Sequence, residues 1–146
     1  MQQSEIKHFE ERRLMPAEEK LEVRKRERRI SIGIPANISE DEQCLPLTPQ
    51  AVEIMVNAGH EVFVETNAGV KARYTDLQYS EAGAFITPSK AEIFQCDIVL
   101  KVASFSESEI SMLRGNQLIF SMLQIDTQSE STMRMLMQKK ITAVAF

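Results

Sequence analysis

Tryptophan is absent from this sequence, and cysteine and aromatic residues are scarce. No apolar run approaches the ~20 residues that a membrane-spanning helix needs, and no signal-peptide core is present. The two isolated cysteines, Cys44 and Cys96, are typical of reduced thiols rather than of a disulfide framework. We therefore expect a cytoplasmic location, no membrane partner, and an aliphatic core in which the eight methionines fill gaps.

Charge is spread unevenly along the 146 residues. The net charge of −4 gives no support to a nucleic-acid partner. The first 29 residues hold nine of the 17 Lys and Arg residues and seven of the 21 Asp and Glu residues. Residues 1–28 are predicted to form a charged helical extension, interrupted at Pro16. It would be solvated or packed on the domain or a neighbouring subunit, and a membrane-surface or nucleic-acid arm is the alternative.

From residue 29 onward, short apolar runs alternate with capped amphipathic segments, and no repeat or internal linker interrupts them. Such alternation predicts one α/β domain over 29–146, with a doubly wound parallel sheet of the Rossmann-like or flavodoxin-like kind. Thr48, Thr75, Ser89, Ser106 and Ser129 are predicted to begin its helices, and Ser89 and Ser106 each have a glutamate three residues later, as in a capping box. The predicted strands are 30–34, 61–65, 84–87, 97–102, 117–123 and 141–146.

The stretch from Arg29 to Pro49 organises the predicted domain. It passes from an alternating strand through an acidic loop to a helix start, and open α/β sheets bind ligands beyond the carboxyl ends of their strands. The turn at Thr66–Gly69 has one glycine, which is too weak a signal for a phosphate loop. A G-x-G-x-x-G fingerprint is absent. The sequence also ends inside a predicted apolar strand, a poor place for a natural C-terminus, so we expect a domain of a longer protein.

Several short motifs share their order and spacing with one known family. They are Ile32-Gly-Ile-Pro35, Leu47-Thr-Pro49, Asn57-Ala-Gly-His-Glu-Val62, Glu81-Ala-Gly-Ala84, Leu100-Lys-Val102 and Lys140-Ile-Thr-Ala-Val-Ala145. In these motifs the chain resembles the N-terminal domain of alanine dehydrogenases and nicotinamide nucleotide transhydrogenases, from about Arg29 to Phe146.

The resemblance also implies positions for three site residues. Alanine dehydrogenases place an arginine for the substrate carboxylate where this chain has Cys44, a lysine for the keto oxygen at Ala103, and an acid/base histidine at Gln124. The catalytic set is therefore unknown, and Lys101, Gln124 and Cys44 are the candidates for the substrate cleft. Lys101 and Gln124 either contact a ligand there or merely pack. No spacing of ligand residues predicts a metal site.

The resemblance implies the substrate-side domain of an NAD(P)-dependent oxidoreductase, inactive alone, with the dinucleotide-binding domain outside this chain. The parent protein would use NAD or NADP, act on an amino or keto acid and form a homo-oligomer, whereas this chain alone would bind no cofactor. The alternative is a regulatory or assembly module that has lost its catalytic residues. The polarity of the cleft separates the two, because an apolar cleft favours the module.

Overall fold

The computed structural model describes residues 29–36, 44–123 and 129–145. A six-stranded parallel sheet runs through them in the order β3-β2-β1-β4-β5-β6. Its strands are β1 (Ser31–Ile34), β2 (Glu61–Glu65), β3 (Phe85–Thr87), β4 (Ile98–Leu100), β5 (Leu118–Ser121) and β6 (Thr142–Ala145). This is the strand order of the dinucleotide-binding fold. The predicted parallel α/β sheet is confirmed, and the predicted extension 1–28 lies outside the described residues.

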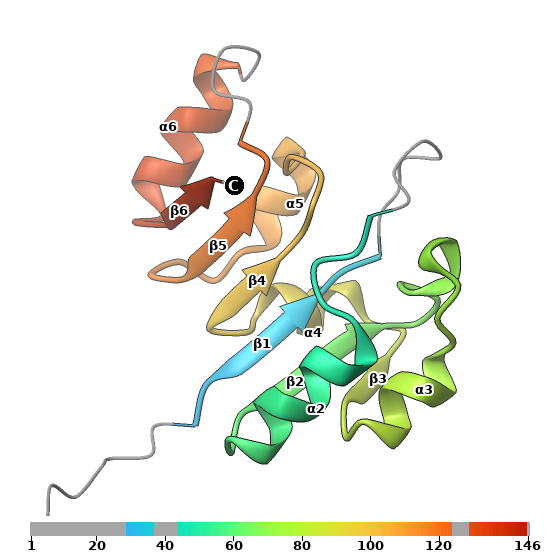
Figure 1. The fold of residues 1–146 in the computed structure, drawn as a ribbon. Coiled ribbons are helices and arrows are strands. Elements are labelled where there is room, and N and C mark those ends of the chain that lie inside the picture. Colours follow the sequence, from blue (N-terminus) through green and yellow to red (C-terminus); the bar gives the residue numbers. More distant parts are fainter. Residues whose placement is uncertain (1–28, 37–43, 124–128, 146) are drawn as a thin grey trace, which may run out of the picture.

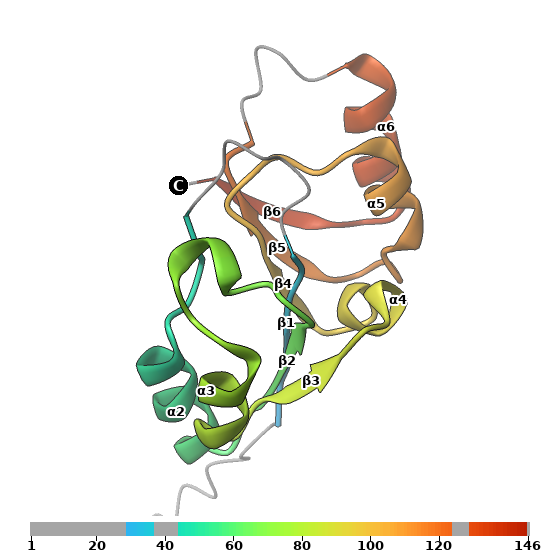
Figure 2. The same cartoon turned by 90° about the vertical axis from the view of Figure 1, so that its right-hand side faces the viewer.

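Helices cover both faces of the sheet. Figure 2 shows α2 (Pro49–Asn57) and α3 (Asp76–Glu81) on one side, and α4 (Lys90–Phe94), α5 (Glu107–Met112) and α6 (Glu130–Gln138) on the other. A 3-10 turn, η2 (Val70–Ala72), follows β2. The direction of winding reverses between β1 and β4, which lie side by side at the centre of the sheet (Figure 1). None of the helices in these described ranges is long and apolar enough to cross a membrane.

Two apolar clusters form the core because strand side chains alternate between the two faces. The first lies between the sheet and α2 and α3 and contains Ile32, Ile34, Val52, Val62, Val64, Tyr79 and Ala84. The second lies on the opposite face and contains Phe94, Val99, Phe105, Ile110, Leu113, Ile119 and Leu136. Successive residues of β1 and β4 therefore point into different surroundings.

Most predicted helix starts are confirmed. The Thr48 hydroxyl accepts a hydrogen bond from the Ala51 amide at 3.4 Å, and Thr75 and Ser106 each form a complete capping box. The capping box predicted at Ser89 is wrong, since its side chain caps nothing. Thr87, at the end of β3, displaces it: its hydroxyl donates to Glu92 at 2.6 Å and accepts from the Ser89 amide at 3.1 Å.

Candidate functional site

The carboxyl ends of β1, β2 and β4 form the edge where ligands bind in folds of this type. Beyond β1, the amide of Ala36 donates to the carboxylate of Glu65, the last residue of β2, at 2.7 Å. The chain is described again from Cys44, which is exposed. Leu45 and Leu47 then pack against the first cluster on the way to α2. Glu65 thus fixes where the chain leaves β1, and these leucines fix where it returns.

Tyr79 of α3 anchors the returning segment. It is fully buried, and its hydroxyl donates to the carbonyl of Leu47 at 2.8 Å. Burial raises the pKa of this phenol to about 12. The hydroxyl is therefore a neutral hydrogen-bond donor at any ordinary pH.

Replacing Tyr79 with phenylalanine is expected to lower the free energy of unfolding by about 1 kcal/mol, because the buried Leu47 carbonyl loses its donor. Urea denaturation of the full chain measures it. Tyr74→Phe is the matched control, since Tyr74 packs edge-on against Tyr79 at 6.3 Å and its hydroxyl has no hydrogen-bond partner among the described residues. Equal losses of unfolding free energy in the two variants would contradict the role of the Tyr79 hydroxyl in anchoring Leu47.

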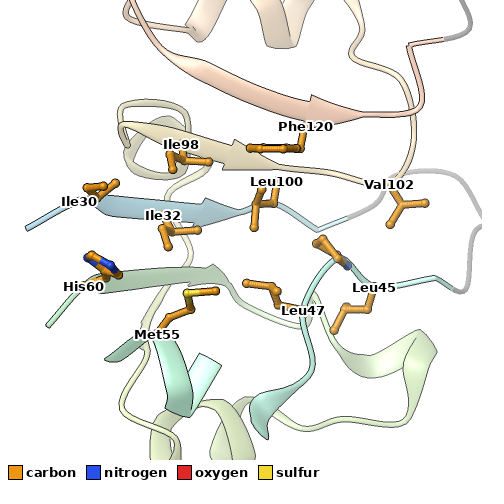
Figure 3. Close-up of a pocket in the computed structure, with 11 residues that line it drawn as sticks. Ile30, Ile32, Leu45, Leu47, Met55, His60, Ile98, Leu100, Val102 and Phe120 are labelled. Atoms are coloured by element: carbon orange, nitrogen blue, oxygen red, sulfur yellow. The ribbon is translucent and has the colours of Figure 1, made fainter. Parts of the chain in front are cut away.

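An open pocket of about 530 Å³ lies against the sheet on the α2 side. All its lining side chains except His60 are apolar: Ile30, Ile32, Leu45, Pro46, Leu47, Met55, Ile98, Leu100, Val102 and Phe120 (Figure 3). His60 Nδ1 is buried and has no hydrogen-bond partner within the part of the chain that the structure describes. Leu45 and Val102 both lie at the end of the pocket towards the ligand edge (Figure 3). This pocket therefore has the apolar character that is expected of a regulatory or assembly module.

The side chain of Lys101 points away from this pocket. In β4 and its extension, Ile98, Leu100 and Val102 face the pocket, so Lys101 falls on the opposite face, beneath α5. Its ammonium is 2.7 Å from Glu109 Oε2 and 3.1 Å from the carbonyl oxygen of Ser104. Lys101 is only 5% exposed, so its charge is neither in solvent nor in the described pocket.

Glu109 is the partner that sequence reasoning missed, because it was assigned only a capping role. It is 1% exposed, and its Oε2 accepts from the amide of Ser106 at 2.9 Å as well as from Lys101. Burial acts to raise the pKa of this carboxyl, but the hydrogen bonds from Lys101 and Ser106 outweigh it and hold the pKa below its usual range. A signal was present in the sequence: a lysine within a buried strand needs a counterion, and Glu109 lies in the next helix beside the core residue Ile110.

Other predicted site residues lie near the pocket mouth without entering it. Cys44 and Ala103 each adjoin a lining residue, Leu45 and Val102 respectively. Gln124 lies outside the described residues. The structure therefore brings the Cys44 and Ala103 segments to one edge, and the Lys101 backbone to the same edge with its side chain turned away. Within the described ranges no group of three His, Cys, Asp or Glu residues could hold a metal ion.

The turn after β2 offers no open glycine to the phosphates of a dinucleotide. The one glycine in the turn after β2, Gly69, is buried against Tyr74 and Tyr79, and a Cβ there would meet the Tyr79 ring at 2.7 Å. This glycine therefore serves close packing and is not open to a phosphate.

Comparison with known proteins shows which family has this sequence and fold. Residues 33–146 match the family model described as "Alanine dehydrogenase/PNT, N-terminal domain". The chain belongs to this family. The resemblance noted in the sequence is confirmed.

Relatives of this alanine dehydrogenase/PNT N-terminal domain are much longer than the chain. It is 34% identical over 117 residues to alanine dehydrogenase 2 of Staphylococcus aureus, covering 80% of this chain and 31% of that protein. Alanine dehydrogenase of Staphylococcus saprophyticus is 34% identical over 115 residues, covering 79% of this chain and 31% of that protein. The chain thus spans less than a third of the length of both relatives.

Comparison with solved structures also shows that the chain matches only part of longer proteins. An L-alanine dehydrogenase superposes with a TM-score of 0.75 at 34% identity, covering 80% of this chain and 32% of that one. A transhydrogenase from Sinorhizobium meliloti superposes with a TM-score of 0.69 at 24% identity, covering 78% of this chain and 34% of that one, and this second likeness concerns the fold alone.

The two cysteines of this N-terminal domain should differ sharply in reactivity. Cys44 is exposed, whereas Cys96 is buried, and burial raises the pKa of the Cys96 thiol to about 11. At mildly alkaline pH a maleimide is expected to modify Cys44 and leave Cys96 intact until the chain unfolds. Intact-mass spectrometry with and without urea measures this, with Cys96→Ala as the control. Two labels added at equal rates to the folded chain would contradict it.

Proposed function

We propose that this chain is the substrate-side domain of an NAD(P)-dependent oxidoreductase of the alanine dehydrogenase/transhydrogenase type, inactive by itself. The observation that carries the proposal is the family match over 33–146, which includes strands β2 to β6 and the second half of β1. The substrate is an amino or keto acid. NAD or NADP is bound by a dinucleotide domain elsewhere in a longer protein, and the reaction takes place in the cytoplasm.

In this proposal the substrate lies at the carboxyl edge of the sheet. The edge consists of the segments around Cys44 and Ala103 and of Gln124. A thiol, a methyl group and an amide stand where the resemblance implies an arginine, a lysine and a histidine. Neither Cys44 nor Ala103 can form the bidentate contact that arginine makes with a carboxylate, and a glutamine does not exchange protons near neutral pH. The charged contacts to the substrate and the proton-transfer group therefore come from other residues of the longer protein.

The test compares this chain with the protein encoded by the longer reading frame that contains it. Reduction of NAD⁺ and NADP⁺ by L-alanine, followed by the absorbance of the reduced nicotinamide, is expected for the longer protein and not for the chain. Cys44→Arg in the longer protein is the informative variant, because an added guanidinium should lower the KM for the amino acid. Turnover by the isolated chain, or none by the longer protein with amino or keto acids, would refute the proposal.

The second candidate is a non-catalytic regulatory or assembly module. The observation that favours it is the apolar pocket, into which no described charged side chain projects. The discriminating measurement is calorimetric titration of the longer protein with L-alanine and pyruvate. A module is expected to bind neither of them, whereas an enzyme that has replaced its catalytic residues still binds one.

We also propose that the whole protein is a homo-oligomer to which residues 1–28 contribute as a charged helical extension. Light scattering on the full chain and on variants with neutralised arginines in that extension tests it. A single oligomeric state that is insensitive to those arginines would count against a role for the extension.

A further inference from the structure

A buried ion pair lies beneath the loop that connects β4 to α5. Lys101 is 5% exposed and Glu109 is 1% exposed, and their charged atoms are 2.7 Å apart. Burying two charges costs several kcal/mol each unless they are well paired and hydrogen-bonded. The proposed substrate edge uses neither side chain for contact, so the role of this pair is a separate question.

Both partners of the pair also hold the main chain of the loop. Lys101 Nζ donates to the carbonyl oxygen of Ser104 at 3.1 Å. Glu109 Oε2 accepts from the Ser106 amide at 2.9 Å and from the Ser106 hydroxyl at 3.2 Å. Hydrogen bonds with one charged member are about twice as strong as neutral ones. The loop is thus attached on each side of Phe105 to two side chains that bind each other.

Two further groups complete the surroundings of the pair. Lys90 of α4 brings its ammonium within 3.3 Å of Glu109 Oε1, an ion pair without hydrogen-bond geometry. The Lys101 ammonium also lies 5.5 Å from the centre of the Phe105 ring, which belongs to the second core cluster. Glu109 is therefore faced by one cation from the end of β4 and one from α4, and by the first turn of its own helix.

The loop held in this way forms part of the candidate substrate edge. Val102 lines the pocket on one face of the sheet, and Phe105 is buried on the other. Ala103 lies between them, at the position where the resemblance implies a substrate lysine. Any change in the path of residues 102–106 moves Val102 and Ala103 relative to Leu45 across the pocket mouth.

We propose that Lys101 and Glu109 are positioning residues: their ion pair fixes the main chain of residues 102–106 and so sets the shape of the substrate edge at Val102 and Ala103. Lys101 is thereby assigned to holding the loop rather than to binding the substrate. The inference rests on the proposed function only in taking this edge as the substrate edge. The hold on the loop is a property of the chain itself and is tested without cofactor or substrate.

The test is a pH titration of the full 146-residue chain followed by amide proton and nitrogen chemical shifts. The Ser106 amide is expected to titrate with Glu109, with a midpoint below the usual range of a glutamate. In Lys101→Met the midpoint should rise, and in Glu109→Gln the transition should vanish. If the chemical shift of the Ser106 amide does not change as Glu109 is protonated in the unmodified chain, the proposal is wrong. This measurement needs no variant that might fail to fold.

Hydrogen exchange provides the second measurement. In Lys101→Met, exchange of the Ser106 amide should accelerate about tenfold relative to the β1 and β2 amides, because a hydrogen-bonded charge is lost beneath the loop. Lys101→Arg keeps the charge and should restore most of the protection. Glu130→Gln, in the exposed Arg134–Glu130 pair, is the control and should change nothing. Uniform acceleration in loop and strands would overturn the proposal, since it would mean that the pair only adds global stability.

Discussion

Replacing Glu109 with leucine is expected to lower the free energy of unfolding by about 3–5 kcal/mol, the range for removing one partner of a buried ion pair. The loss arises because Lys101, 5% exposed, is left charged and without its counterion in an apolar setting. The Ser106 amide loses its acceptor as well. Small domains have only about 5–15 kcal/mol of stability in total, so this change should bring the chain close to unfolding.

The double variant Lys101→Met/Glu109→Leu should recover most of that loss. Replacing a whole buried pair by apolar side chains of similar size is often neutral. Urea denaturation followed by far-ultraviolet circular dichroism measures both variants. Glu130→Leu, in an exposed pair whose side chains are 70% and 80% exposed, is the control and should cost less than about 1 kcal/mol. A loss below that value for Glu109→Leu would show that Lys101 reaches solvent or another partner.

The same pair predicts how stability depends on pH. The pKa of Glu109 is held below its usual value in the folded chain. Its contribution is therefore fully present above the unfolded-state pKa of about 4.3 and is lost as the pH falls through the folded-state pKa. In Glu109→Leu the loss of stability on acidification should be smaller than in the unmodified chain.

Replacing Gly33 with alanine is expected to cost at least about 3 kcal/mol, at the upper end of the range for overpacked cores. Gly33 lies in the central strand β1 and faces α4. A Cβ there would be 2.4 Å from the backbone oxygen of Ile93 and 3.2 Å from the sulfur of Cys96. Because the first of these atoms belongs to the main chain, α4 would have to move away from the sheet as a unit.

Gly59→Ala separates this packing effect from the conformational effect of losing a glycine. Gly59 has a φ of +91°, and a Cβ there would meet nothing within 4 Å. Alanine at this position should therefore lower the free energy of unfolding by only about 1–2 kcal/mol, the cost of holding a non-glycine residue in a left-handed backbone conformation. Urea denaturation of both variants provides the comparison. If Gly33→Ala lowers the free energy of unfolding by no more than Gly59→Ala does, α4 moves away from the sheet at little cost. The glycine of the Ile-Gly-Ile-Pro motif is then not required for packing.

Sequence alone determined most of the fold, because the signals that specify it are local. Short apolar runs, some alternating and some continuous, identified each strand. Hydroxyl side chains at Thr48, Thr75, Ser106 and Ser129 marked helix starts that the structure confirms. Local signals failed at Ser89. Thr87, a residue of the preceding strand, binds the Glu92 carboxylate and the Ser89 amide that would otherwise pair with each other. The Glu92 amide donates to the Ser89 carbonyl instead of to its hydroxyl.

Sequence also determined the family, because several short motifs in fixed order specify it together. The same motifs located the site positions that now hold Cys44, Ala103 and Gln124. They could not say what those positions do, since a missing arginine, lysine or histidine leaves the function of its replacement open. The assignments of Cys44 and Gln124 to a substrate cleft remain predictions.

Only the tertiary structure decided which way Lys101 points and what it meets. A side chain at a strand end can face either side of the sheet, and one residue of register separates the apolar pocket lined by Val102 from the buried carboxylate of Glu109. The pocket itself was equally beyond the sequence, because it combines Ile30, Met55, Leu100 and Phe120 from four separate elements or their flanks. The periodicity of a sequence predicts that a residue is buried. Which residues it contacts there is decided only by the packing of segments that are distant in the sequence.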